Sequence, residues 1–230
     1  MSANDVSLQS LIRIEPAADP AFICDGTAVS RAEFSAKIEQ TAAWLAAQDI
    51  GKGDVVAVWL VNRVEWLTLL FAAARLGAVV AAVNTRYRSA EVAHLLKLSG
   101  AKLMVVEAAF RAIDFTAILA GIAKDEVPAL QRLAVVGADA IPAHWPCLRF
   151  DAFDTPYPPA PPPQDDVDLP VLLYTTSGTT KGPKLVAHSQ ATLATHAVSV
   201  ARALQLDPQR DSLLAMLPFC GTFGMTSLLG

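Results

Sequence analysis

Hydroxyl, glycine and lysine residues are concentrated in one stretch of this sequence, residues 174–184, with the order YTTSGTTKGPK. Glycine lets a ligand approach the backbone closely, because it carries no Cβ atom. Hydroxyls and backbone amides bind the oxygens of a polyanion, and a lysine ammonium supplies the opposite charge. The stretch therefore predicts a phosphate-binding loop, and its alternative is a flexible surface turn of the same composition.

The stretch differs from the P-loop of nucleoside triphosphatases. That motif has four residues between its two glycines and a lysine directly after the second. Here three residues separate Gly178 from Gly182, and Pro183 stands where the lysine is required. We therefore expect a phosphate loop of another type.

The string from Thr176 to Lys184 resembles a known signature, Thr/Ser-Ser-Gly-Thr-Thr-Gly-x-Pro-Lys. It is the phosphate-binding signature of the AMP-forming adenylating enzymes, which include acyl-CoA synthetases, luciferases and adenylation domains of peptide synthetases. One position departs, because Lys181 stands where the family has glycine. The resemblance implies that Lys184 is the catalytic countercharge. The ATP phosphate-binding residues that it implies are Thr176, Ser177, Gly178, Thr179, Thr180, Gly182 and Lys184.

A second segment, Leu217–Gly224, is similar to the family motif Leu-Pro-Leu-Phe-His-x-x-Gly. Gly221 replaces the histidine that lines the acid pocket in many relatives. The resemblance implies an acid pocket at Phe219 and Gly221 that is roomier than usual, which favours a bulky or long apolar acid. Further matches at residues 51–58, 62–66, 76–79 and 84–91 are core and turn positions, and they indicate the fold rather than catalysis.

The resemblance also implies a reaction. A carboxylic acid attacks the α-phosphate of ATP, pyrophosphate leaves, and the acyl-adenylate is captured by the thiol of coenzyme A. The substrates and cofactors would be the acid, ATP, Mg²⁺ and CoA, with a carrier protein as the other possible acceptor. The three cysteines and four histidines form no metal-ligand spacing, so we expect no metal-binding residues in this chain.

Helical and strand-like periods alternate along the chain and predict an α/β fold. Ser30 and Glu33 form a capping-box pattern before an amphipathic helix. Residues 55–60 are continuously apolar, which is typical of a strand covered on both faces. We expect mostly parallel sheets flanked by helices, with a complete first subdomain and a truncated second one.

The predicted division follows a change in composition. Residues 154–170 hold seven of the 15 prolines and predict an extended connector, or alternatively a proline-rich ligand for a partner protein. Residues 1–153 would form the first α/β subdomain. Residues 171–230 would begin the second with the phosphate loop, a helix from about Ser189 and a strand at 212–217.

Composition limits the partners. The 230 residues carry 18 basic and 22 acidic side chains, a net charge of −4, so a nucleic acid is not expected. No charge-free stretch is long enough to cross a bilayer, and the N-terminus lacks the pattern of a secretory signal. Cys24, Cys147 and Cys220 fit three ordinary thiols in a reducing cytoplasm. The oligomeric state stays open.

Two further hypotheses remain beside an active acid–CoA ligase. Family members are more than twice this length, so the chain would be a truncated, non-catalytic fragment that binds nucleotide weakly at most. The third hypothesis is a binding module that uses the proline-rich connector.

Overall fold

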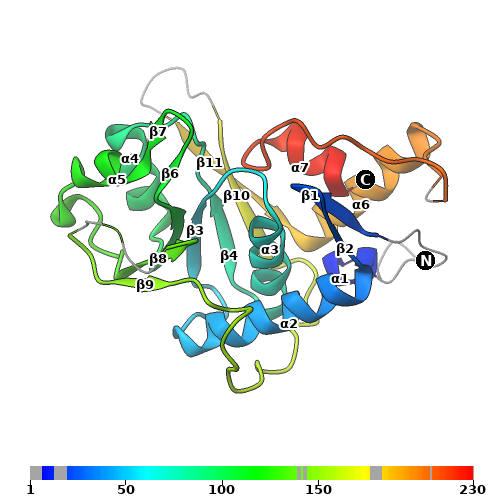
Figure 1. Cartoon of the computed structure of the whole chain (residues 1–230), viewed down its shortest axis with the longest axis horizontal. Helices are drawn as coiled ribbons and strands as arrows, with labels where there is room; N and C mark the ends of the chain where they lie inside the picture. The colour runs from blue at the N-terminus through cyan, green and yellow to red at the C-terminus, as the bar shows by residue number, and fades with distance from the viewer. Residues whose placement is uncertain are drawn as a thin grey trace.

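A seven-stranded sheet organises the protein (Figure 1). The computed structural model describes residues 7–12, 20–138, 141, 144–176, 183–207 and 209–229. The strand order is β11-β10-β4-β3-β5-β8-β9, and all neighbouring pairs are parallel except β10 with β11. The strands are β3 (Val55–Trp59), β4 (Val79–Ala82), β5 (Leu103–Glu107), β8 (Arg132–Val136), β9 (Cys147–Arg149), β10 (Pro170–Thr176) and β11 (Lys184–Ser189). The predicted mostly parallel α/β fold is confirmed.

Helices cover both faces of this sheet, and two small antiparallel sheets lie outside it (Figure 1). The helices are α1 (Leu8–Ile12), α2 (Arg31–Ala47), α3 (Val64–Leu76), α4 (Ser89–Ser99), α5 (Phe115–Ala120), α6 (Gln190–Ala203) and α7 (Thr222–Leu229), with a 3₁₀ turn η1 (Lys124–Glu126). The small sheets pair β1 (Phe22–Cys24) with β2 (Thr27–Val29) and β6 (Ala109–Phe110) with β7 (Ile113–Asp114).

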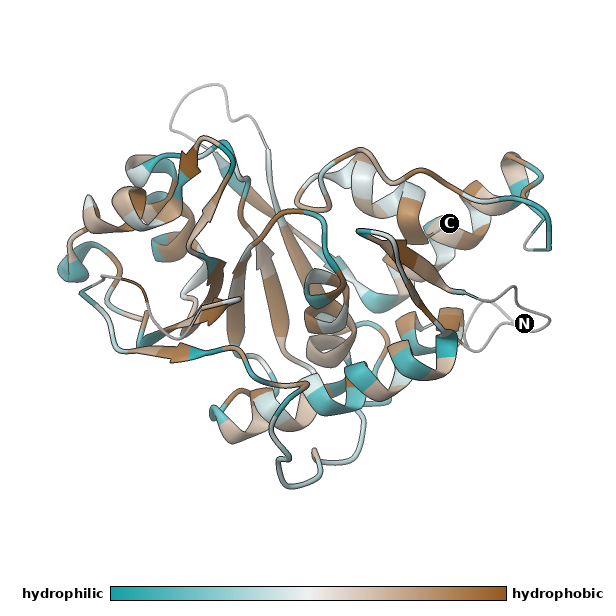
Figure 2. Ribbon diagram, in the orientation of Figure 1, coloured by the Kyte–Doolittle hydropathy of each residue, from teal (hydrophilic) through white to brown (hydrophobic). Residues whose placement is uncertain are grey.

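Side-chain alternation along each strand divides the core between the two faces. Val56 and Val58 of β3 belong to the cluster that packs on α2 and α3. Ala57 and Trp59 belong to the cluster that packs on α4 and α5. Figure 2 shows the central strands coloured as hydrophobic. Strands buried on both faces need continuous apolar sequence, which explains why residues 55–60 lack the alternation of a half-exposed strand.

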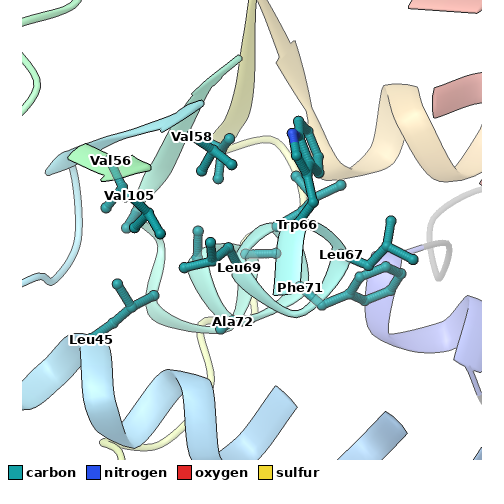
Figure 3. Close-up of a cluster of buried hydrophobic side chains, with 14 of the residues drawn as sticks. Leu45, Val56, Val58, Trp66, Leu67, Leu69, Phe71, Ala72 and Val105 are labelled. Atoms are coloured by element: carbon teal, nitrogen blue, oxygen red, sulfur yellow. The ribbon is translucent and has the colours of Figure 1, made fainter. Parts of the chain in front are cut away.

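Helix α3 is apolar around most of its circumference because it is enclosed on several sides. Leu69 lies between Val58 and Val105 of the sheet and Leu45 of α2 (Figure 3). The helix ends at Gly77, which has φ +70° and a left-handed conformation. The predicted capping box of α2 is confirmed, since Ser30 Oγ accepts from the Glu33 amide at 3.1 Å and Glu33 accepts from the Ser30 amide at 2.7 Å.

The proline-rich connector, residues 154–170, passes along α3 and leads into β10. The carbonyl of Arg75 accepts from the amide of Gln164 at 2.9 Å, and the Arg75 guanidinium donates to the Pro161 carbonyl at 2.7 Å. The same guanidinium contacts Glu39 of α2 at 2.8 Å. Beyond the connector, β10 pairs with β4, so residues 170–176 lie in the same sheet as the strands before the connector.

The prediction of a strand at residues 212–217 is wrong, because this segment has neither helical nor strand structure. Its large apolar side chains stay mostly exposed: Leu214 is 79% exposed and Met216 is 75% exposed. The following helix, α7, packs its residue Gly224 directly on the Pro218 carbonyl, and a Cβ atom there would overlap that oxygen. At Gly221 an added Cβ atom would stay 3.5 Å from the same oxygen, which is ordinary contact.

Replacing Leu69 by alanine should lower the free energy of unfolding by about 3 kcal/mol, because this side chain is fully buried and would leave a cavity. Chemical denaturation measures the change. The matched control is Leu98→Ala, whose side chain is 52% exposed and should cost less than about 0.5 kcal/mol. Equal losses in the two variants would contradict the packing described for α3.

Gly224→Ala should destabilise the protein by about 1–3 kcal/mol, because α7 must move away from Pro218 to admit the methyl group. Gly221→Ala, three residues earlier, should be tolerated since its Cβ atom makes only an ordinary contact, 3.5 Å from the Pro218 carbonyl oxygen. Thermal unfolding of the two variants side by side checks this. The opposite order of stability would refute the contact between α7 and Pro218.

Candidate functional site

The carboxyl ends of β3, β4 and β10 lie next to one another at one edge of the sheet, because these strands are parallel neighbours. In open α/β sheets, ligands bind at this edge. Three segments leave it: residues 60–63 after β3, residues 83–88 after β4, and the predicted phosphate loop after β10. The structure thus brings together segments that are far apart in the sequence.

The predicted phosphate loop connects β10 to β11. Thr176 ends β10 and is paired in register with Lys184, the first residue of β11, and both are exposed. The remaining predicted phosphate-binding residues lie outside the described residues: Ser177, Gly178, Thr179, Thr180 and Gly182. The structure therefore describes the two residues that flank the loop, and these lie on adjacent antiparallel strands.

Both ends of the loop contact residues that follow β4 in the sequence, one in segment 83–88 and one in α4. The hydroxyls of Tyr87 and Thr175 are 2.7 Å apart. On the other side, His94 Nε2 of α4 lies 2.9 Å from the Pro183 carbonyl oxygen. The sequence offers no neighbour for His94, so only the fold reveals this contact. His188 lies in β11, with its ring 5.7 Å from that of Tyr174.

The predicted acid-pocket residues lie close to the same strand. Phe219 is buried, its ring is 6.1 Å from that of Trp66, and its carbonyl accepts from the Tyr174 hydroxyl at 3.4 Å. Burial, followed by the influence of Cys220, raises the pKa of Tyr174. Gly221 is half-buried in the turn before α7. Residues 213–219, which end at the predicted acid-pocket residue Phe219, are called the acid segment below. Tyr174 thus contacts the acid segment, and the hydroxyl of its neighbour Thr175 is hydrogen-bonded to that of Tyr87.

An ion-pair network fixes the backbone after β3. Arg63 contacts Glu65 at 2.9 Å and Glu107 at 3.6 Å, and Glu107 accepts from the Val61 amide at 2.7 Å. Burial raises the pKa of Glu107 despite that hydrogen bond and the Arg63 charge. Burial acts in the same direction on Glu65, but its hydrogen bond to Arg63 and the Arg63 charge outweigh it and lower the pKa of that carboxyl.

Between these groups lies Asn62, whose side chain contacts the acid segment. Its amide nitrogen donates to the carbonyls of Ala215 at 3.1 Å and Leu217 at 2.8 Å, and its oxygen accepts from the Phe219 amide at 2.9 Å. The family resemblance at residues 62–66 points to fold only, so sequence analysis missed this contact.

A separate cavity of about 490 Å³ lies among α1, α2, α3, α6 and α7. Its lining includes Phe22, Phe34 and Phe71, and includes none of Thr176, Lys184, Phe219 and Gly221.

In the part of the chain that the structure describes, no three His, Cys, Asp or Glu side chains gather closely enough to hold a metal ion. Within the same residues, no helix combines the length and apolar character needed to cross a membrane.

Comparison with known proteins identifies the family. The family model described as "AMP-binding enzyme" matches residues 13–230. The long-chain-fatty-acid–CoA ligase FadD13 of Mycobacterium tuberculosis is 32% identical over 198 residues, which are 86% of this chain and 37% of FadD13. The 4-coumarate–CoA ligase CCL1 of Humulus lupulus is 30% identical over 216 residues, 89% of this chain and 36% of that ligase.

The solved structures agree with this result. The inhibitor-bound N-terminal domain of FACL13 from Mycobacterium tuberculosis superposes with a TM-score of 0.79 at 26% identity, covering 97% of this chain and 54% of that one. The chain therefore spans well under half the length of the two curated ligases and about half of this solved domain. The match to the family model extends over nearly the whole sequence, and the chain belongs to the AMP-binding enzyme family.

Proposed function

We propose that this chain takes part in the ATP-dependent activation of a carboxylic acid to an acyl-adenylate, followed by thioester formation with coenzyme A. Family membership supports the proposal, as do relatives that are named CoA ligases. The observation that carries it is the common sheet edge shared by the two ends of the phosphate string and the acid segment at Phe219. ATP phosphates and acid must meet at one place for this reaction.

The chemistry assigned to the chain is charge stabilisation and positioning. The acid carboxylate is itself the nucleophile toward the α-phosphorus of ATP, so the chain supplies no general base. As pyrophosphate departs, negative charge develops on its oxygens, and donors aimed at that charge lower the barrier. In this proposal Lys184 supplies the cation, and the hydroxyls of Thr176, Ser177, Thr179 and Thr180 supply donors.

Mg²⁺ is expected to accompany ATP in the proposed reaction. Mg²⁺ is held by carboxylates together with substrate phosphates and water. Within the described residues no three His, Cys, Asp or Glu side chains are grouped to hold a metal ion, and no step assigned here depends on Mg²⁺. ATP and CoA are substrates of the proposed reaction.

The acid is proposed to be a long or bulky apolar one. Gly221 leaves space next to the buried Phe219, where a Cβ atom would meet nothing closer than 3.5 Å. A long apolar chain gains about 0.8 kcal/mol for each buried CH₂ group, so such a space favours large acids. The three free cysteines fit a reducing compartment such as the cytoplasm.

The alternative is weak nucleotide binding without catalysis. It is favoured by one observation, that the chain spans 37% of FadD13. Acid-dependent ATP–pyrophosphate exchange by the 230-residue chain separates the two. Exchange above background supports an active ligase, whereas ATP binding without exchange supports the alternative.

Lys184→Ala should slow ATP–pyrophosphate exchange about 100-fold, since removing a charged contact made mainly in the transition state costs about 3 kcal/mol. Acid affinity should stay within about twofold, because Lys184 is assigned to the phosphates. If the chain shows no exchange, the affinity for MgATP takes its place as the readout and should fall. The control is Lys124→Ala, an exposed lysine on η1. An exchange rate and MgATP affinity equal to the control would remove the role given to Lys184.

Gly221→His should fold, since a Cβ atom has room at this position, and should fill the space beside Phe219. We expect about tenfold weaker binding of dodecanoate and little change for acetate, measured by titration calorimetry. Gly221→Ala is the matched control and should have a smaller effect. A preference of the unmodified chain for acetate over dodecanoate would contradict the proposed acid class.

A further inference from the structure

The segment 213–219 is held in place mainly by polar contacts rather than by burial of its apolar side chains. Leu213, Leu214, Met216 and Leu217 are between 50% and 79% exposed. Ala215 packs against the core, and Phe219, at the end of the segment, and the following Cys220 are buried in it. The backbone of this exposed, irregular stretch therefore depends on hydrogen bonds for its position.

The Asn62 side chain supplies three of those bonds to alternate residues of the segment. Two are donated by Nδ2 to the carbonyls of Ala215 and Leu217, and one is accepted by Oδ1 from the amide of Phe219. Asparagine is suited to this because its amide group is a donor and an acceptor at once. An isosteric carboxylate could accept from Phe219 but would repel the other two carbonyl oxygens.

Asn62 itself is rigidly placed relative to the sheet. It follows the buried strand β3 and precedes α3, whose residue Trp66 is fully buried. On one side Val61 donates to Glu107 at 2.7 Å, and on the other Arg63 binds Glu65 at 2.9 Å. The Asn62 side chain thus holds the acid segment at a fixed place relative to the carboxyl end of β3.

We propose that Asn62 is a positioning residue for the carboxylic-acid pocket: it fixes the backbone of residues 215–219 and thereby the places of Phe219 and Gly221. The inference rests on the proposed function, because it assigns the acid to these two residues. Asn62 touches the segment and not the phosphate loop ends Thr176 and Lys184, so its effect should be confined to the acid.

The test compares Asn62→Ala and Asn62→Asp with a matched control, Gln9→Ala. The side chain of Gln9 also donates to a backbone carbonyl, that of Phe71 in α3, at 3.1 Å, but makes no bond to residues 215–219. The exchange rate of the Phe219 amide hydrogen, measured by NMR, reports directly on its hydrogen bond to Asn62 Oδ1. In Asn62→Ala this amide should exchange at least tenfold faster, with the amides of β3 and β5 unchanged, and Gln9→Ala should leave Phe219 unaffected.

Binding measurements then test the consequence for the acid. Both Asn62 variants should bind dodecanoate about tenfold more weakly while MgATP affinity stays within twofold, and Gln9→Ala should change neither. A merely volume-filling role predicts normal dodecanoate binding in Asn62→Asp, and that result would overturn the proposal. So would unchanged Phe219 exchange in Asn62→Ala, or equal losses of dodecanoate and MgATP affinity.

The outcomes separate this proposal from the proposed function. If the unmodified chain binds MgATP but not dodecanoate, the acid assignment itself fails, and the role of Asn62 in acid binding fails with it. If the unmodified chain binds both and the Asn62 variants match it, only the positioning role is refuted.

Discussion

The parallel pairing of β10 with β4 is the constraint on which the rest of the site depends. Leu172 lies opposite Val80 and Leu173 opposite Ala81, which places a strand from beyond the connector beside β4, a strand from before it. Since β3, β4 and β10 run in the same direction, their three following segments emerge at one edge. Without this pairing, the phosphate string and residues 60–63 would have no common location.

Polar side chains then connect the segments that the sheet places side by side. Each segment at the edge bonds to one from elsewhere in the chain: Asn62 to the acid segment, and Tyr87 to Thr175 of β10. His94 adds a contact to Pro183, which directly precedes β11 at the loop end of the same hairpin. Apolar packing fixes the strands and helices, whereas these hydrogen bonds fix the connecting segments, which lack enough buried apolar surface to hold themselves.

Sequence patterns predicted the features that depend on local order. The continuous apolar run at 55–60 indicated a doubly covered strand, and Ser30 with Glu33 indicated a helix start, because periodicity and capping act within a few residues. Patterns failed where long-range contacts decide. The run at 212–217 is apolar enough for a strand, yet it lies exposed at the surface and its backbone is bonded to Asn62.

In the candidate site, too, the sequence predicted the residues of a local string and missed those that distant segments supply. A contiguous string such as 176–184 carries its chemical character in its own residue types, so the resemblance to adenylating enzymes needed no structure. The supporting residues Asn62, Tyr87 and His94 lie far from their partners in the sequence. No local sequence pattern therefore predicts their contacts. The predicted boundary at 154–170 illustrates the limit, since composition marks the connector but not that β10 would rejoin the sheet on its other side.

Hydrogen-exchange mass spectrometry of the 230-residue chain, with MgATP or dodecanoate added separately, examines the shared edge most directly. The arrangement described here predicts that MgATP protects peptides covering 174–188, that dodecanoate protects peptides covering 215–224, and that β5 and β8 exchange as before. Protection by dodecanoate around Phe22 and Phe34, in the separate cavity, or by MgATP away from β10 and β11, would contradict it.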